Sequence, residues 1–390
     1  MIYLDNAATS FRKPDSVYQA VDHAMRHCSG NPGRAGHKVS LLANDIVRKT
    51  RLLCATLFNA ERAEQIVFCA NATEALNLAI KGILHTGDHV VTTSMEHNSV
   101  ARPLEAMKMN GVEITKVASS PTYGVDPESI RKNLKENTRL VVATHISNVT
   151  GTVNDIAGVG RICRERGITF LVDAAQSAGA KLIDVQEMNI DLLAFPGHKS
   201  LLGPQGIGGL YVRKGIKLKP LKEGGTGSSS ESLEQPDSMP EGYESGTLNV
   251  PGIAGLGAGI SFIADRGIEE IQKKEDSAIR SIVDGLLSLR KVSVYGPPPG
   301  HPRGAVISFN IEGMGPQDVA ILLDAEYGIA VRGGLHCSPD AHRTIGTLLS
   351  GGTVRVSPNY FTETEEIESF IKAVEMVVNE IGRASCRERV

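Results

Sequence analysis

A lysine within a glycine-rich loop is the strongest chemical signal in this sequence. Residues 195–209 read FPGHKSLLGPQGIGG, in which Lys199 follows a short apolar run and precedes several glycines. A lysine that is partly desolvated there, beside His198, loses its proton more easily and can form a Schiff base with an aldehyde cofactor. A solvated surface lysine is the alternative. The glycines do not open a helix in an early βαβ unit, so they do not indicate a dinucleotide fingerprint.

Two other polar residues follow apolar runs. Asp173, in VDAAQ, stands at the end of an expected strand, where open α/β sheets bind ligands. Facing a pyridine nitrogen, its carboxylate would keep that nitrogen protonated. Thr73, in NATEALN, stands at an expected helix start, where backbone N–H groups and a hydroxyl can bind an anion. Helix capping is the alternative explanation for both residues.

A cysteine with cationic neighbours is the candidate nucleophile. Cys337 lies in VRGGLHCSPDAH, next to His336 and close to Arg332. Glycine and proline predict an accessible loop, and nearby positive charge favours the thiolate. A buried structural cysteine is the alternative.

Two further residues could bind a ligand. Arg355, in the apolar run TVRVS, needs an anionic partner, and a carboxylate held by two hydrogen bonds would serve. His97, in MEHNS after another apolar run, could lie flat on a cofactor ring, although a lone histidine is usually structural.

The elements that must position these residues alternate along the chain. β-branched runs alternate with amphipathic stretches, which predicts a mostly parallel sheet with helices on both faces. The expected strands are 65–69, 89–93, 140–144, 168–173, 192–195 and 209–212, and the expected helices include 73–84 and 155–166. Residues 224–246 read as a long, functional surface loop. A helical stretch over 252–289 then leads to a mixed α/β unit with strands 305–310 and 352–357 and helices 316–327 and 364–381.

Composition excludes several classes of protein. The 390 residues carry a formal net charge of −3 without a basic block, which argues against a nucleic-acid partner. No apolar run is long enough to span a bilayer, and the N-terminus MIYLDNAATS is not a signal peptide. We therefore expect a cytoplasmic protein without a membrane partner. Six dispersed cysteines without a CxxC pair predict neither a metal site nor a disulfide framework.

Together and in this order along the chain, the motifs TEALN, EHNS, VDAAQ, GHK, YESGT and RGGLHC resemble the cysteine desulfurase and selenocysteine lyase family. These are pyridoxal-phosphate enzymes of the class V aminotransferase group. The resemblance runs from YLDNAAT at 3–9 to NYFTETEEI at 359–367. It implies the fold-type I scaffold, with a seven-stranded sheet in a large domain (15–255) and a small α/β domain (1–14 and 256–382). Residues 383–390 continue no helical pattern and are expected to be a disordered or vector-derived tail.

The resemblance also implies roles for individual residues. Lys199 would carry the cofactor and move the substrate Cα proton, His97 would stack on the ring, and Cys337 would attack the substrate sulfur. Thr247, in YESGT, would reach the phosphate in the neighbouring subunit, which implies a homodimer with shared sites. The other implied cofactor contacts are Asn71, Ala72, Thr73, Asn148, Asp173, Gln176 and His198. The implied substrate contacts are Asn148, Arg332, Arg355, and Asn31 and Arg34 of the segment NPGRAGH, which also contains His37.

The reaction implied by the resemblance converts L-cysteine to L-alanine and leaves sulfur on Cys337 as a persulfide for a protein acceptor. Such enzymes serve iron–sulfur assembly, tRNA thiolation, sulfur-containing cofactors and modified DNA. The compact RGGLHCSP loop resembles group II of the family. Pro196 replaces the serine of the common SGHK form, and Leu335 and Ser338 replace the histidine and alanine of HHCA. Selenocysteine lyase, cysteine sulfinate desulfinase, another class V aminotransferase or lyase, and a non-catalytic cofactor-binding module are the alternatives.

Overall fold

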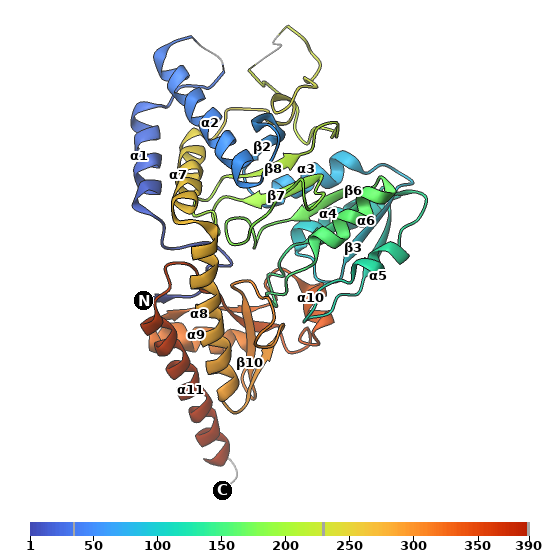
Figure 1. The fold of residues 1–390 in the computed structure, drawn as a ribbon. Coiled ribbons are helices and arrows are strands. Elements are labelled where there is room, and N and C mark those ends of the chain that lie inside the picture. The colour runs from blue at the N-terminus through green and yellow to red at the C-terminus, as the bar shows by residue number, and fades with distance from the viewer. Residues whose placement is uncertain (34–35, 228–230, 388–390) are drawn as a thin grey trace.

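A computed structural model describes residues 1–33, 36–227 and 231–387. Its larger sheet has seven strands in the order β2-β8-β7-β6-β5-β3-β4 (Figure 1). All neighbouring pairs are parallel except those of β8, which runs antiparallel to both β2 and β7. The predicted mostly parallel sheet is therefore confirmed. The strands are β2 (Ile66–Cys69), β3 (His89–Thr93), β4 (Glu113–Val117), β5 (Thr138–Thr144), β6 (Thr169–Asp173), β7 (Leu192–Pro196) and β8 (Gly208–Val212).

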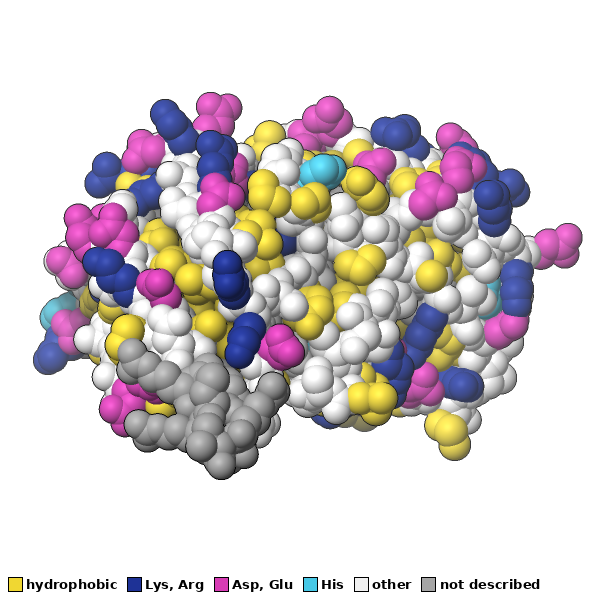
Figure 2. All heavy atoms as spheres, turned by 90° about the horizontal axis from the view of Figure 1, so that it is seen from below, with side chains coloured by type: hydrophobic (Ala, Val, Ile, Leu, Met, Phe, Trp, Pro, Cys, Tyr) yellow, Lys and Arg dark blue, Asp and Glu magenta, His cyan; other side chains and the backbone are white. Residues whose placement is uncertain are grey.

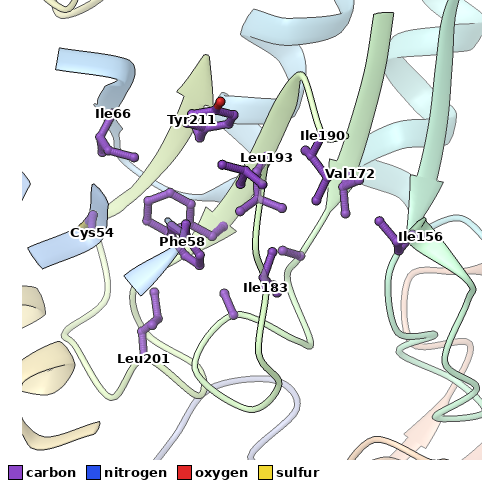
Figure 3. Packing of buried hydrophobic residues seen from close by; sticks show 14 of the residues in the cluster. Cys54, Phe58, Ile66, Ile156, Val172, Ile183, Ile190, Leu193, Leu201 and Tyr211 are labelled. Carbon is purple, nitrogen blue, oxygen red and sulfur yellow. The ribbon is translucent and has the colours of Figure 1, made fainter. Parts of the chain in front are cut away.

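Helices cover both faces of this sheet, as its apolar strands require. Side chains alternate across a strand, so Ile66 and Phe68 of β2 pack in one apolar cluster while Val67 and Cys69 pack in another. Figure 3 shows part of the first cluster, where Phe58 lies against the sheet. The helices of this part are α1 (Asp15–His27), α2 (Lys38–Leu57), α3 (Ala72–Ile83), α4 (Asn98–Met109), α5 (Pro127–Lys132), α6 (Ile156–Arg166) and α7 (Val250–Arg266), with short 3₁₀ turns at Ala63–Gln65 and Glu241–Tyr243.

A second, smaller sheet has four antiparallel strands in the order β12-β13-β10-β9. The first residues of the chain lie beside it, because β1 (Ile2–Tyr3) pairs in parallel with β11 (Ile329–Ala330). The strands are β9 (Val292–Tyr295), β10 (Ile307–Ile311), β12 (Arg332–Gly334) and β13 (Thr353–Val356), and the helices are α8 (Ile268–Ser288), α9 (Pro316–Tyr327), α10 (Pro339–Thr344) and α11 (Thr364–Arg387). The division of the chain into domains at residues 15, 255 and 382 stays a prediction.

Two predicted boundaries are wrong. The helical stretch 252–289 is broken at Gly267, whose φ of 82° ends α7 before α8 begins. The backbone of α11 continues to Arg387, five residues into the segment that was expected to be a tail. Residues 383–387 contain no proline, and their arginine and alanine favour a helix.

Edge strand β4 has no counterpart among the predicted strands. Its sequence EITKV exposes Glu113 and Lys116, which hides the apolar pattern on which strand prediction relies. Because β4 pairs only with β3, its charged residues lie at a free edge, where they are commonly found.

The charged side chains of both signs are intermixed on the face shown in Figure 2, in line with the net charge near zero. None of the helices in the described part of the chain combines the length and the apolar character needed to cross a bilayer.

A buried ion pair anchors the end of the long loop that was predicted at 224–246. The guanidinium of Arg51 on α2 donates to both carboxylate oxygens of Glu244, at 2.7 and 2.8 Å. The same carboxylate accepts the backbone N–H of Phe68 at 2.6 Å, and the Arg51 guanidinium also lies over the Phe68 ring. Such doubly hydrogen-bonded pairs are geometrically specific, so Glu244 fixes the segment that precedes Thr247.

Replacement of Glu244 by glutamine should destabilise the protein. The variant Glu244→Gln leaves the buried Arg51 without its counter-charge, which typically costs about 3–5 kcal/mol. We expect a correspondingly lower midpoint of urea unfolding, whereas Glu234→Gln, at an exposed position, should unfold like the wild type. An unchanged midpoint for Glu244→Gln would contradict the anchoring role.

Candidate active site

A cavity of about 210 Å³ opens where three neighbouring parallel strands end. Thr144, Asp173 and Pro196 are the last residues of β5, β6 and β7, and all three line it. This is the edge at which open α/β sheets bind ligands. The predicted site residues that line the cavity are Asn71, Ala72, Thr73, His97, Asn148, Asp173, Gln176, His198, Lys199, Arg332 and Arg355.

Lys199 and Asp173 have opposite charges and lie in a poorly solvated environment. Removal of water from the Lys199 amine, aided by the positive charge of Arg355, lowers its pKa to about 8. Burial raises the pKa of Asp173 above its usual value, although a hydrogen bond from the Ala175 backbone N–H and the charge of Lys199 act in the other direction. A lysine with such a pKa is neutral far more often near neutral pH than a solvated lysine is, as a nucleophilic or basic lysine needs.

A hydroxyl network joins the starts of helices α3 and α4 at the cavity. The Ser99 hydroxyl bonds to Thr73 Oγ1 at 2.8 Å and to His97 Nδ1 at 2.9 Å. The Ser99 backbone N–H also donates to His97 Nδ1, so this nitrogen is an acceptor and the ring proton is on Nε2. Burial and the charge of Lys199 lower the pKa of His97 to about 4, so its ring is neutral.

The helix cap predicted as the alternative role of Thr73 is supplied by the residue two positions before it. Asn71 caps α3, since its side chain accepts the backbone N–H of Glu74 at 2.9 Å, and it still lines the cavity. The helix start therefore faces the cavity with its remaining N–H groups, which favour an anion there. Nearby, Nδ1 of His198 is buried and has no hydrogen-bond partner among the described residues.

The buried Arg355 has an anionic partner within the chain. Its Nη2 donates to Asp5 Oδ1 at 2.8 Å and its Nη1 donates to the Asn148 carbonyl at 3.2 Å, whereas Nε has no partner among the described residues. Sequence reasoning missed Asp5 as a site residue, although the aspartate of YLDNAAT and an arginine within an apolar strand each called for a partner of opposite charge.

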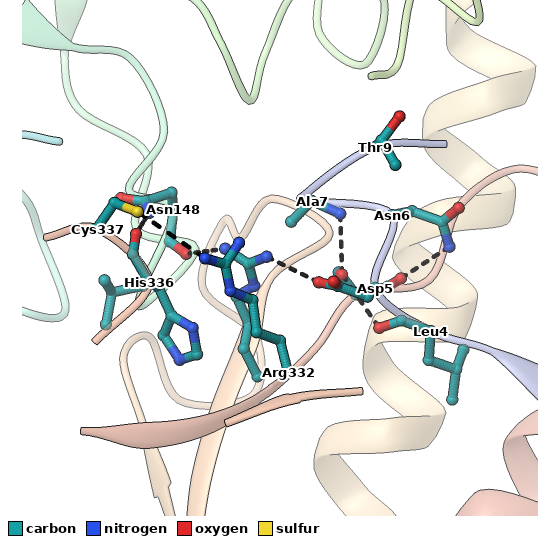
Figure 4. A network of polar contacts seen from close by, with 12 residues as sticks. Leu4, Asp5, Asn6, Ala7, Thr9, Asn148, Arg332, His336 and Cys337 are labelled. Atoms are coloured by element: carbon teal, nitrogen blue, oxygen red, sulfur yellow. Dashed lines mark hydrogen bonds and ion pairs between the residues drawn. The ribbon is translucent and has the colours of Figure 1, made fainter. Parts of the chain in front are cut away.

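Cys337 is not among the residues that line the cavity, and Figure 4 shows it beside Arg332. Its thiol is exposed, and Sγ lies 3.8 Å from Nη2 of Arg332, which does line the cavity. Four other cysteines, Cys28, Cys54, Cys69 and Cys163, are buried, so the buried alternative holds for them and not for Cys337.

The histidine beside this thiol is not the cation that the sequence suggested. His336 is buried, and burial together with the charge of Arg355 lowers its pKa to about 2. Its ring is therefore neutral, and Arg332 is the positive group that lies against the sulfur.

The backbone at the nucleophile loop is strained. His336 has a φ of 50° and Cys337 a φ of 58°, the left-handed conformation that costs residues other than glycine about 1–2 kcal/mol each. Strain of this kind persists only where surrounding contacts hold it, and it concentrates at functional sites.

Some predicted residues lie away from this cavity. Asn31 lines a second hollow of about 270 Å³, together with the two neighbours of Thr247 in sequence, Gly246 and Leu248. His37 caps α2 by accepting the backbone N–H of Ser40. Arg34 lies outside the described residues. Within the described part of the chain, no group of His, Cys, Asp and Glu side chains is arranged to hold a metal ion.

Comparison with known proteins agrees with this geometry. Residues 2–370 match the class-V aminotransferase family. A probable cysteine desulfurase of Methanothermobacter thermautotrophicus is 37% identical over 96% of this chain and 94% of its own. The chain belongs to the cysteine desulfurase family.

Solved structures of cysteine desulfurases share the fold. The apo structure from Thermococcus onnurineus superposes with a TM-score of 0.90 at 34% identity, covering 97% of this chain and 95% of that one. A cysteine desulfurase of Escherichia coli in an S-sulfonic acid form has a TM-score of 0.86 at 27% identity, with 97% and 94% coverage. The predicted fold class and family of this cysteine desulfurase relative are thus confirmed.

The lowered pKa of Lys199 is open to direct measurement. Acetic anhydride labels only the neutral amine, so labelling of Lys199 in the cofactor-free protein should rise with pH and reach half its maximum near pH 8. Peptide mass spectrometry can quantify this, with the exposed Lys217 as the control for reagent access. A Lys199 midpoint near the ordinary lysine pKa of about 10.4 would show that the amine is fully solvated.

Proposed function

We propose that this protein is a pyridoxal-phosphate-dependent cysteine desulfurase, which converts L-cysteine to L-alanine and leaves the sulfur on Cys337 as a persulfide. One observation carries the proposal: the exposed Cys337 Sγ lies 3.8 Å from Nη2 of Arg332, and Arg332 lines the same cavity as Lys199. The names of the family relatives support the same reaction.

The cavity fits the cofactor of the proposed reaction. Lys199 would bind its aldehyde carbon, Asp173 would face the pyridine nitrogen, and His97 would lie on the ring. Thr73, His198 and the N–H groups at the start of α3 would hold the phosphate, for which the unpartnered Nδ1 of His198 offers a further contact. Gln176 and Asn148 would lie by the ring hydroxyl. When bound, pyridoxal phosphate supplies an electron sink for a negative charge at the substrate Cα.

The residues of this chain would perform the remaining steps. The neutral amine of Lys199 would take the Cα proton of L-cysteine, while Arg332 and the free Nε of Arg355 would bind the substrate carboxylate. The Cys337 thiolate would attack the substrate sulfur. An S–S bond forms as the C–S bond breaks, and its electron pair stays with the substrate carbon. The substrate Cβ then takes up a proton and Lys199 would return its proton to Cα, which gives alanine and leaves the sulfur on Cys337.

A homodimer with shared sites is part of the proposal. Asn31 lines a hollow separate from the Lys199 cavity, and so do Gly246 and Leu248, the two sequence neighbours of Thr247. Residues that serve a partner's site would lie apart from the cavity of their own subunit in this way. Helices α1 and α2 also carry exposed apolar side chains, among them Met25, Leu41 and Leu52, a composition suited to an interface. An apolar patch of this kind is otherwise unfavourable on a surface.

The sulfur held on Cys337 needs an acceptor. The loop from β12 to α10 is short, so Cys337 is held close to the cavity, as in the group II-like arrangement expected from the sequence. We propose transfer to a protein acceptor, with iron–sulfur cluster assembly as one destination, in the cytoplasm and without nucleic acid or membrane as a partner.

Simultaneous measurement of both products tests the proposed reaction. We expect the purified, cofactor-loaded protein, given L-cysteine and a thiol reductant, to release alanine and sulfide in equal amounts. Alanine without sulfide, or neither product while cysteine sulfinate or selenocysteine is turned over, would assign the protein to one of the alternative activities.

Removal of the nucleophile should separate cysteine from substrates that expel their leaving group more easily. We expect Cys337→Ala to lower alanine release from L-cysteine at least 100-fold and to leave turnover of cysteine sulfinate within about threefold of the wild type, since that reaction does not need a thiol. Cys28→Ala, at a buried position outside the cavity, is the control. Unchanged cysteine turnover in Cys337→Ala would contradict the mechanism.

The dimer can be tested through its apolar face. Light scattering should give twice the chain mass of 41.6 kDa for the wild type. Leu41→Asp places a charge where an apolar contact is expected, so we predict at least a tenfold weaker dimer, while Leu349→Asp at another exposed leucine should leave it unchanged. A monomeric wild type would exclude the shared sites.

A further inference from the structure

The side chain of Asn148 bonds the chain on both sides of Cys337. Its Nδ2 donates to the His336 carbonyl at 2.7 Å (Figure 4). Its Oδ1 accepts the Ser338 hydroxyl at 2.8 Å. The carbonyl can only accept a hydrogen bond, so the amide can hold this position in one orientation only. Both bonds are buried.

The Ser338 hydroxyl is available for this contact because it does not cap α10. Ser338 occupies the N-cap position of α10, where serine usually accepts a helix N–H, yet its side chain makes no capping bond. The residue is completely buried, and its hydroxyl lies against Asn148 instead. The serine that departs from the family's common HHCA form thus has a defined partner in this chain.

Cys337 lies between His336 and Ser338, the two residues that Asn148 bonds. Cys337 and His336 both have positive φ angles, and the Cys337 carbonyl accepts the backbone N–H of Asn98 at 2.8 Å. Side chains alternate along the loop, with His336 and Ser338 buried and Cys337 exposed. The buried neighbours are therefore the points at which the exposed thiol can be fixed.

We propose that Ser338 and the side chain of Asn148 form a clamp that positions the Cys337 thiol for attack on the substrate sulfur. The proposal rests on the proposed function, in which Cys337 accepts sulfur. Asn148 also lines the cavity, and its carbonyl accepts a hydrogen bond from Arg355. The clamp thus connects the loop of the nucleophile directly to the residues that hold the substrate.

A positioning role predicts an effect that depends on the substrate. Ser338→Ala removes one of the two bonds, and we expect kcat for L-cysteine to fall about tenfold with KM unchanged, a size typical of one lost buried hydrogen bond. Turnover of cysteine sulfinate, which does not need the thiol, should stay within twofold. Ser338→Thr restores a hydroxyl and should recover part of the loss. Ser119→Ala, which alters a buried hydroxyl without a described partner, is the matched control.

The loop itself provides a readout that needs no activity. Hydrogen–deuterium exchange of residues 332–339 should be several-fold faster in Ser338→Ala than in the wild type or Ser119→Ala, because the Ser338 N–H bond to the Leu335 carbonyl lies within the clamped turn. Unchanged exchange would overturn the clamp. Equal losses for both substrates would show that Ser338 supports the fold or the cofactor rather than the thiol.

The two readouts also separate this proposal from the proposed function. If the wild type releases no alanine from cysteine but Ser338→Ala speeds loop exchange, the clamp exists and the desulfurase assignment fails. If the wild type is active and Ser338→Ala retains full cysteine turnover, the clamp does not position the thiol.

Discussion

The parallel arrangement of β5, β6 and β7 is the constraint on which the rest of the site depends. Parallel strands that lie side by side bring their carboxyl ends to one edge, so Thr144, Asp173 and the loop that contains Lys199 meet although they are far apart in sequence. The continuous apolar strands needed for this arrangement also require cover on both faces, which the helices supply. Water is thereby kept from the inner end of the cavity, and the pKa of Lys199 falls as a consequence.

Two buried arginines are each paired with a carboxylate from a distant part of the chain. Arg51 pairs with Glu244 beneath the segment that leads to Thr247, and Arg355 pairs with Asp5 beside the cavity. In each case the two partners are separated by more than 190 residues, so ion pairs of this kind tie distant segments to the core. Removal of one partner alone is costly, because the other charge stays buried.

The sequence predicted the parts of the structure that leave a local pattern. Apolar runs located β2, β3, β5, β6, β7 and β8, and the family resemblance implied that Lys199, Asp173, Thr73 and His97 share one site, where all four line one cavity. It did not show β4, whose charged residues suit a free edge, or the partnership of Asp5 with Arg355, which depends on tertiary contact. The neutral state of His336 likewise follows from its burial, which its sequence neighbours do not predict.

The pairing of Asp5 with Arg355 gives the first few residues an importance that chain ends rarely have. Terminal segments usually tolerate trimming because few contacts hold them. Here β1 is only two residues long, yet it pairs with β11 and leads directly to Asp5, the carboxylate that pairs with Arg355. Deletion of residues 1–5 would remove Asp5 and leave the poorly solvated guanidinium of Arg355 without its counter-charge. Shortening this end of the protein would therefore change the candidate active site itself.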